Sequence, residues 1–140
     1  MRGRLLLISC LTVAVACSQT KGPRSFDLDL PVSWREANAL IVVFHDLEVP
    51  ENRPVVFRLF APGKGEESSL GSLPIIATSP EARGIKRFER AEVNVTTAFR
   101  RWAETSKPGQ RVSIRVEPFA GLREAKDYAW KVREVKVELR

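Results

Sequence analysis

Few residues of this chain could carry out chemistry, and they are widely spaced. Its 140 residues include two cysteines, one histidine and three tryptophans. Cys17 could accept a covalent modification on its thiol, His45 could act as a base or a metal ligand, and Trp34 could offer an aromatic face to a partner or ligand. Whether any of them does so depends on the residues that the sequence places around it.

His45 has no neighbours in the sequence that would complete a catalytic or metal site. Asp46 follows it, but adjacent residues on a strand point to opposite faces, so the two should not form a dyad. A metal site needs about three or four ligands, and a nucleophilic site needs a base within reach. No serine lies in a G-x-S-x-G motif. We therefore expect no catalytic residue, no metal and no cofactor, and we expect that the chain is not an enzyme.

The charge distribution argues against nucleic-acid binding. The formal net charge is +6, from 23 basic and 17 acidic residues. Arg2 and Arg4 lie in the leader described next, and without them the excess is +4. The remaining basic residues are scattered among acidic ones and form no stripe interleaved with aromatic residues. We expect no nucleic-acid partner.

Residues 1–16 have the organisation of a secretory signal peptide. Met1–Arg4 is a short cationic segment, and Leu5–Ala16 is an apolar run of 12 residues. A membrane-spanning helix needs about 20 residues, whereas the apolar region of a signal peptide has about 7–15. The small residues Ala14 and Ala16 would direct cleavage to the bond before Cys17.

Such cleavage would make Cys17 the first residue of the mature chain. The stretch AVAC resembles the lipobox of bacterial lipoproteins, in which small residues precede a cysteine that receives lipid, although leucine is usual where Ala14 stands. Cys10 would leave with the leader, so Cys17 would have no internal disulfide partner. We expect Cys17 to be lipidated. Ordinary cleavage with secretion is the alternative, and an uncleaved anchor is a third possibility.

Lipidation would hold the chain in the cell envelope by its N-terminus. Ser18 stands where an aspartate often retains lipoproteins at the inner membrane, so we favour the outer membrane. Residues 17–25 are polar, with a glycine and a proline, and predict a flexible tether. Residues 26–140 remain as a single domain, which we expect to be a monomer.

Among the tryptophans, we assign Trp34 to a partner or ligand surface. Trp102 would share a helical face with Phe99, and Trp130 lies in phase with Tyr128, so both are expected in the core. Trp34 instead stands between a Pro-Val-Ser segment and the longest apolar run of the domain.

The domain is expected to be mostly β. Asn38–Val49 is apolar at successive positions, which predicts a central strand covered on both faces, and Arg111–Phe119 alternates, which predicts one buried face. Leu70–Thr78 is broken by a glycine and a proline and predicts an edge or bulged strand. The last two alternating segments are out of phase, which predicts a bulge at Arg133–Glu134. Further strands are expected over Phe26–Leu30, Val55–Ala61 and Phe88–Val95.

One amphipathic helix is expected over Thr96–Ser106. Thr96 would cap its N-terminus, and the sequence KPGQ that follows would end it. Phe99, Trp102 and Ala103 would share its apolar face. Many short strands with Gly/Pro turns and one short helix predict an antiparallel β-sandwich.

The order of these features resembles the small C-terminal β-domain of tyrosinases and plant polyphenol oxidases. A strand and a PENRP turn lead to an FRLF strand, a charged loop and a GSLP segment. A strand that runs directly into an amphipathic helix follows, then a VSIRVEPFAG strand and a last VREVKVEL strand. The resemblance covers Ala39–Arg140 and implies a jelly-roll-like sandwich. The matching segments are Pro50–Ala61, Gly71–Pro74, Val93–Glu104, Arg111–Gly121 and Val132–Leu139.

The resemblance does not extend to the catalytic half of a tyrosinase, whose copper site is built from several histidines. This chain has one histidine, so oxidase activity is not implied. In that family the C-terminal domain packs over the copper site and shields it in the latent enzyme. The resemblance thus implies a protein that binds or shields a partner in trans, with a copper oxidase of the tyrosinase type as the most specific candidate partner.

Two other functions stay open. An envelope module that binds a ligand such as a glycan would need an aromatic groove around Trp34. An unrecognised enzyme would need a pocket that gathers His45 with carboxylates.

Overall fold

The computed structural model describes residues 20–63, 68–77 and 79–140. The leader and Cys17 lie outside these residues. The strands are β1 (Thr20–Lys21), β2 (Arg24–Asp29), β3 (Leu40–Pro50), β4 (Val55–Phe60), β5 (Ser69–Ile75), β6 (Ile85–Asn94), β7 (Arg111–Ala120), β8 (Arg123–Glu124), β9 (Ala129–Trp130) and β10 (Glu134–Leu139), and the helix is α1 (Thr96–Ser106).

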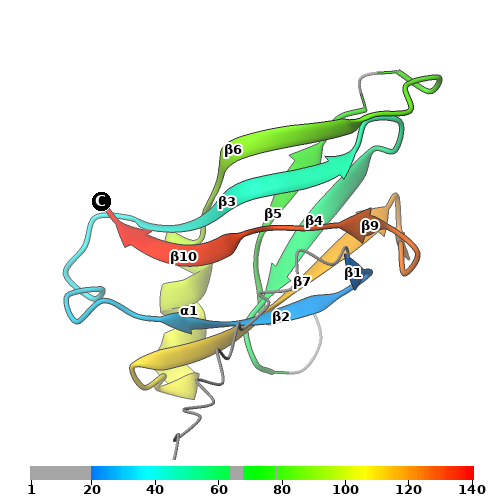
Figure 1. Ribbon diagram of the computed structural model, residues 1–140. Helices are drawn as coiled ribbons and strands as arrows, with labels where there is room; N and C mark the ends of the chain where they lie inside the picture. The colour runs from blue at the N-terminus through cyan, green and yellow to red at the C-terminus, as the bar shows by residue number, and fades with distance from the viewer. Residues whose placement is uncertain (1–19, 64–67, 78) are drawn as a thin grey trace, which may run out of the picture.

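The described residues form two antiparallel sheets that pack face to face, with α1 towards one end (Figure 1). One sheet has the order β10-β3-β6. The other has the order β2-β7-β4-β5, and β8 pairs with the end of β7. β1 and β9 form a separate two-stranded ribbon. The predicted antiparallel β-sandwich with one short helix is confirmed.

The prediction of a central strand covered on both faces is confirmed for β3. All five residues from Leu40 to Phe44 are buried. Leu40, Val42 and Phe44 face the other sheet and belong to the core, whereas Ile41 and Val43 point outwards. Val43 lies between Glu92 of β6 and Lys136 of β10, and Ile41 lies beside Glu138 of β10; the aliphatic stems of these long side chains can cover the outward pair.

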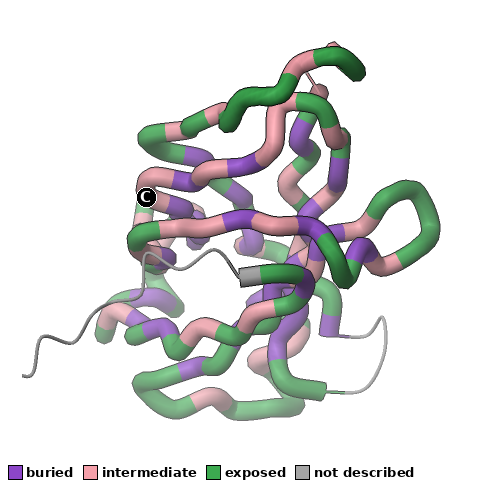
Figure 2. The backbone as a smooth tube through the Cα atoms, turned by 45° about the vertical axis from the view of Figure 1, so that its right-hand side comes forward, coloured by how far each residue is buried: buried purple, intermediate pink, exposed green. Residues whose placement is uncertain are grey.

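The alternation predicted for β7 is confirmed as well. Val112, Ile114 and Val116 are buried, and the polar residues between them are exposed. Burying each of these side chains contributes roughly 1.5–3 kcal/mol. Figure 2 shows buried, intermediate and exposed residues alternating along much of the backbone, with longer exposed stretches in the connecting loops.

The bulge predicted just before β10 is wrong. Glu134 pairs with His45, and Lys131 forms a bridge with Glu48, so the same number of residues separates the two pairings on both strands. The alternation of inward and outward side chains instead shifts by one residue on both strands at the same point. This point lies beside Asp46, whose φ of 52° is in the left-handed region. No residue is inserted, because the neighbouring strands change phase in the same register.

The folded chain begins earlier than predicted. β1 pairs with β9, the Gly22 N–H donates to the Tyr128 carbonyl oxygen (3.0 Å), and the Trp130 indole N–H donates to the Gly22 carbonyl oxygen (2.8 Å). Residues 20–25, which the sequence assigned to the tether, therefore belong to the sandwich. Backbone hydrogen bonds hold this segment, so hydrophobic periodicity gave no sign of it.

The helix has the predicted bounds, but its predicted cap is wrong. Thr96 is its first residue, and its N–H donates to the Asn94 side-chain oxygen (3.1 Å). The Thr96 hydroxyl instead accepts the Leu40 N–H (2.9 Å), which ties the helix to β3. At the other end, Lys107 adopts a left-handed conformation with a φ of 45°. Its N–H donates to the Ala103 carbonyl oxygen, and the helix ends there.

Candidate interaction surface

Trp34 belongs to the core. Its side chain is 7% exposed, and its ring meets that of Phe99 edge-on with centroids 5.2 Å apart. The guanidinium of Arg35 lies 4.7 Å from the ring centroid. The shallow depression beside Trp34 is otherwise lined by Arg35, Arg100, Ala103 and Glu104. This region forms no exposed aromatic groove, because α1 packs against the segment between β2 and β3.

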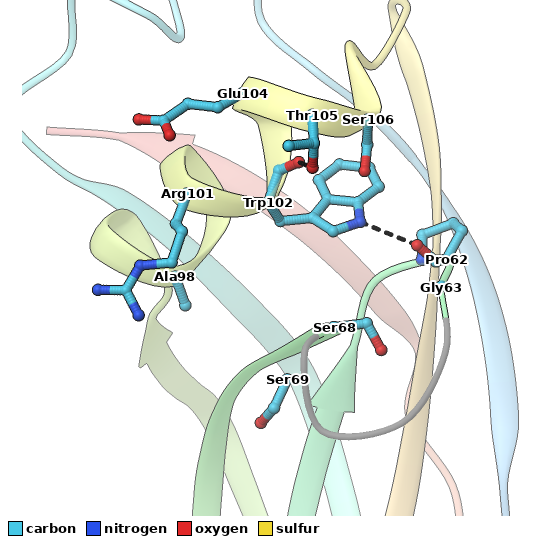
Figure 3. Close-up of a pocket in the computed structure, with 10 residues that line it drawn as sticks. All are labelled: Pro62, Gly63, Ser68, Ser69, Ala98, Arg101, Trp102, Glu104, Thr105 and Ser106. Atoms are coloured by element: carbon cyan, nitrogen blue, oxygen red, sulfur yellow. Dashed lines mark hydrogen bonds between the residues drawn. The ribbon is translucent and has the colours of Figure 1, made fainter.

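Trp102 is more accessible than the sequence suggested. It is half-buried and forms one wall of a depression of about 520 Å³ between α1 and the ends of β4 and β5 (Figure 3). Its indole N–H donates to the Pro62 carbonyl oxygen (2.8 Å). Arg101, Glu104 and Thr105 also line the depression. An aromatic face beside hydroxyl and charged groups suits a polar ligand.

His45 and Asp46 do not act as a pair. The Asp46 carboxylate accepts hydrogen bonds from Arg133 (2.6 Å) and Arg87 (2.8 Å), and these bonds, Arg133 first, lower the pKa of Asp46. His45 lies opposite Glu134 in the sheet. Within residues 20–63, 68–77 and 79–140, no three His, Cys, Asp or Glu residues lie close enough to hold a metal ion.

The outer face of the β10-β3-β6 sheet carries interlinked ion pairs. Glu92 accepts hydrogen bonds from Arg140 (2.5 Å) and Arg90 (2.7 Å), which lower the pKa of Glu92 to about 2. Arg90 also donates to Glu138. These charges compensate one another across the strands, so this face offers little net charge to a partner.

The outer face of the other sheet carries an apolar strip formed by Val56, Pro74, Ile76 and Phe119. Val56 pairs directly with both Phe119 and Pro74, so these three side chains share one face. Ile76 lies two residues beyond Pro74 and is 76% exposed. The guanidinium of Arg58 lies 4.3 Å from the Phe119 ring centroid, and no ion pair joins it to an acid in the described part of the chain.

The strip was missed in the sequence because its residues come from β4, β7, β5 and the residue just after β5. Each residue taken singly looks like an ordinary outward position, and only the pairing of β4 with β5 and β7 gathers them.

The longest helix of the described residues has 11 residues, and none there is long and apolar enough to cross a membrane.

No family model matches the chain, and no curated protein matches its sequence. Solved structures do match its fold. A latent aurone synthase, a polyphenol oxidase from its natural source, aligns with a TM-score of 0.60 and 12% identity over 91% of this chain and 26% of that one. A latent apple tyrosinase aligns with a TM-score of 0.59 and 15% identity over 86% of this chain and 26% of that one.

The chain therefore spans about a quarter of the length of the polyphenol oxidases that it resembles. At this identity the likeness shows a shared fold. It is consistent with the C-terminal domain that the sequence resembles.

Proposed function

We propose that this chain is a lipid-anchored protein of the cell envelope that binds or shields a partner protein in trans and has no catalysis of its own. A copper oxidase of the tyrosinase type is its most specific candidate partner. The observation that carries the proposal is the fold likeness, because 91% of this chain aligns with one quarter of a latent polyphenol oxidase. A domain with this fold would be suited to covering a site on another chain.

The apolar strip is the surface that we assign to the partner. Contiguous exposed apolar patches often mark sites of protein interaction. Aromatic and arginine side chains, such as Phe119 and Arg58, are enriched in the buried centres of protein interfaces. The opposite sheet face is a poorer candidate, since its charges already pair with one another.

The partner proposal is tested with a tyrosinase-type oxidase that lacks its own C-terminal domain. The purified chain carrying Cys17→Ser, which removes the lipid site, should bind this oxidase and slow its oxidation of diphenols. Ile76→Asp should weaken binding about tenfold or more, as expected for an apolar contact in an interface centre. Val32→Asp is the matched control, because Val32 is 93% exposed and lies outside the strip. If the chain with the unaltered strip neither binds the oxidase nor inhibits it, the shielding proposal is contradicted.

The lipid anchor has a separate test. In cells, Cys17→Ser should abolish incorporation of labelled palmitate and release the protein from membranes. Labelling that persists in this variant would show that Cys17 is not the acceptor.

A second candidate function, binding of a glycan, is favoured by the depression beside Trp102. Titration calorimetry against envelope oligosaccharides should then show binding that Trp102→Ala removes, with the near-ultraviolet circular dichroism of the variant confirming that it is folded. Equal binding by the variant would exclude this depression as the site.

A further inference from the structure

We infer that one end of the sandwich rests directly on the membrane and contacts anionic lipid headgroups. This end, the β1 end, is formed by β1 and by the loop between β7 and β9, and its contact residues are Lys21, Leu122, Arg123 and Lys126. The inference rests on the proposed lipid anchor at Cys17 and adds how the domain is oriented.

The stretch of chain between the lipid and the fold is short, which limits how far the domain can stand from the membrane. Thr20 already pairs with Trp130 in the β1–β9 ribbon. Cys17 precedes it by three residues, and an extended chain spans at most about 3.3–3.6 Å per residue, so the two Cα atoms lie within about 11 Å. The tether predicted over residues 17–25 would have reached roughly 30 Å. The shorter link keeps the domain against the bilayer.

The segment that follows Cys17 joins the sandwich at the β1 end. Gly22 packs so closely on Lys126 that a Cβ there would lie 2.8 Å from the Lys126 carbonyl oxygen. The Gly22 N–H also bonds the Tyr128 carbonyl oxygen. Figure 1 shows β1, β9 and the end of β7 together at the right of the molecule, away from α1. Lipid on Cys17 therefore brings this end to the membrane first.

The β1 end exposes an aliphatic side chain and several cations. Leu122 is 93% exposed in the turn between β7 and β8. Lys21 on β1, Arg123 on β8 and Lys126 in the loop before β9 are exposed, and no ion pair in the described part of the chain joins them to an acid, since the neighbouring Asp127 pairs with Arg53. An aliphatic side chain beside several cations is typical of surfaces that meet anionic lipid. A protein partner is less favoured here, because the link already brings lipid within reach.

The apolar strip remains available in this orientation. It lies on the outer face of a sheet, whereas Leu122 lies in the turn beyond the end of β7. A partner can therefore approach the side of the domain while its end contacts lipid.

The experiment uses the intact lipoprotein in vesicles of phosphatidylglycerol and phosphatidylcholine. The lipid occupies the Cys17 sulfur, so Leu122→Cys and Val32→Cys each supply one thiol for a fluorescent label. Val32 is the matched control because it is equally exposed and follows the far end of β2. Quenching by lipids that carry a spin label at the headgroup should be at least about twofold stronger at position 122 than at position 32.

A charge test accompanies it. The Cys17→Ser chain should sediment with vesicles that contain phosphatidylglycerol and not with phosphatidylcholine alone. Lys126→Glu should weaken this association about tenfold, since each cation near an anionic surface adds to binding. Added salt should weaken it as well.

The outcomes separate the two proposals. If the chain is lipidated but quenching is equal at both positions, the membrane contact is overturned and the anchor stands. The same holds if the label at position 122 is protected from solvent only when an envelope protein is added. If the unmutated protein carries no lipid on Cys17 in cells, the anchor is overturned, and with it the orientation that rests on the anchor.

Discussion

The side chain of Tyr128 shows what one buried polar residue implies. It is fully buried against Phe57, with ring centroids 5.8 Å apart, and its hydroxyl has no hydrogen-bond partner among the described residues. Burial raises the pKa of Tyr128 to about 12, because a charged phenolate would lack solvation, although the nearby Arg53 partly opposes this.

The first prediction is that this tyrosine titrates late. It is the one tyrosine of the chain, so tyrosinate absorbance reports on it alone. The midpoint should lie near pH 12 in the folded protein and near the ordinary value of 10.0 in urea. Because the pKa is higher in the folded state, stability should fall as pH rises from about 10 to 12.

Tyr128→Phe is the matched variant. It should remove the loss of stability at high pH and leave the stability at neutral pH unchanged or slightly higher, since it deletes a buried hydroxyl without a partner. A folded protein whose tyrosine titrates near pH 10 would contradict this burial.

The second prediction concerns Glu92. The pKa of its carboxyl is about 2 in the fold against an ordinary 4.5, through hydrogen bonds from Arg140 and then Arg90. A lowered pKa stabilises the fold above about pH 4.5, and this contribution is lost as pH falls towards 2. Glu92→Gln should therefore lower the urea midpoint slightly at pH 7 and make it less dependent on pH between 4.5 and 2. Parallel pH profiles for the two proteins would show that the ion pairs contribute nothing.

At the scale of elements, the three strands of the β10-β3-β6 sheet change phase together. Phe44 and Leu47 on β3 both contribute to the core, although they are three residues apart. Their partners Val135, Ala91 and Phe88 follow the same change. The sheet keeps its register because Asp46 takes a left-handed conformation.

The third prediction concerns the packing of one sheet on the other. Gly71 on β5 has a φ of 155°, and a Cβ there would lie 3.0 Å from Cγ1 of Val93 on β6. Gly71→Ala should therefore destabilise the domain by about 1–3 kcal/mol, because it overpacks the contact between the sheets. Gly109→Ala is the control, since a Cβ there meets nothing within 4 Å. Equal urea midpoints for the two variants would contradict this close approach.

At the scale of the whole molecule, the sandwich is closed at one end by the first residues of the fold. β1 and Gly22 cover β9, where Trp130 and Tyr128 are among the largest fully buried side chains. The Gly22 backbone hydrogen-bonds to both of these residues. Residues 20–22 therefore help to close the core at this end, and a lipid on Cys17 would lie near it.

The fourth prediction follows from this closure. A chain that begins at Phe26 should be less stable than one that begins at Thr20. It loses the β1–β9 pairing and the first two pairs of β2 with β7, at Arg24 and Ser25. It also leaves the Trp130 indole N–H without its acceptor, which alone costs about 1–3 kcal/mol for a buried donor. Urea unfolding followed by tryptophan fluorescence measures the difference. Equal stabilities would place the true start of the domain at Phe26.

The sequence by itself determined the elements whose signal is periodic. The alternation of Arg111–Phe119 and the bounds of α1 were correct, and the strand predicted over Asn38–Val49 is β3 at Leu40–Pro50. Periodicity is a property of neighbouring residues, so it can be seen in the sequence. Leu70–Thr78 was predicted to be an edge or bulged strand, and β5 (Ser69–Ile75) lies at the edge of its sheet, where a proline, which has no N–H to donate, is tolerated. The order of these elements was enough to predict the sandwich and its likeness to the polyphenol oxidases.

Only the tertiary structure decided which surfaces the chain offers. Trp34 was assigned to a surface, but it packs against Phe99 of α1, which is distant from it in the sequence, and this contact helps to bury it. The strip beside Phe119 arises from the register of three strands, and the start of the fold at Thr20 arises from pairing with Trp130. These contacts join residues distant in sequence, and no local pattern encodes such pairings, since they depend on how the whole sandwich closes.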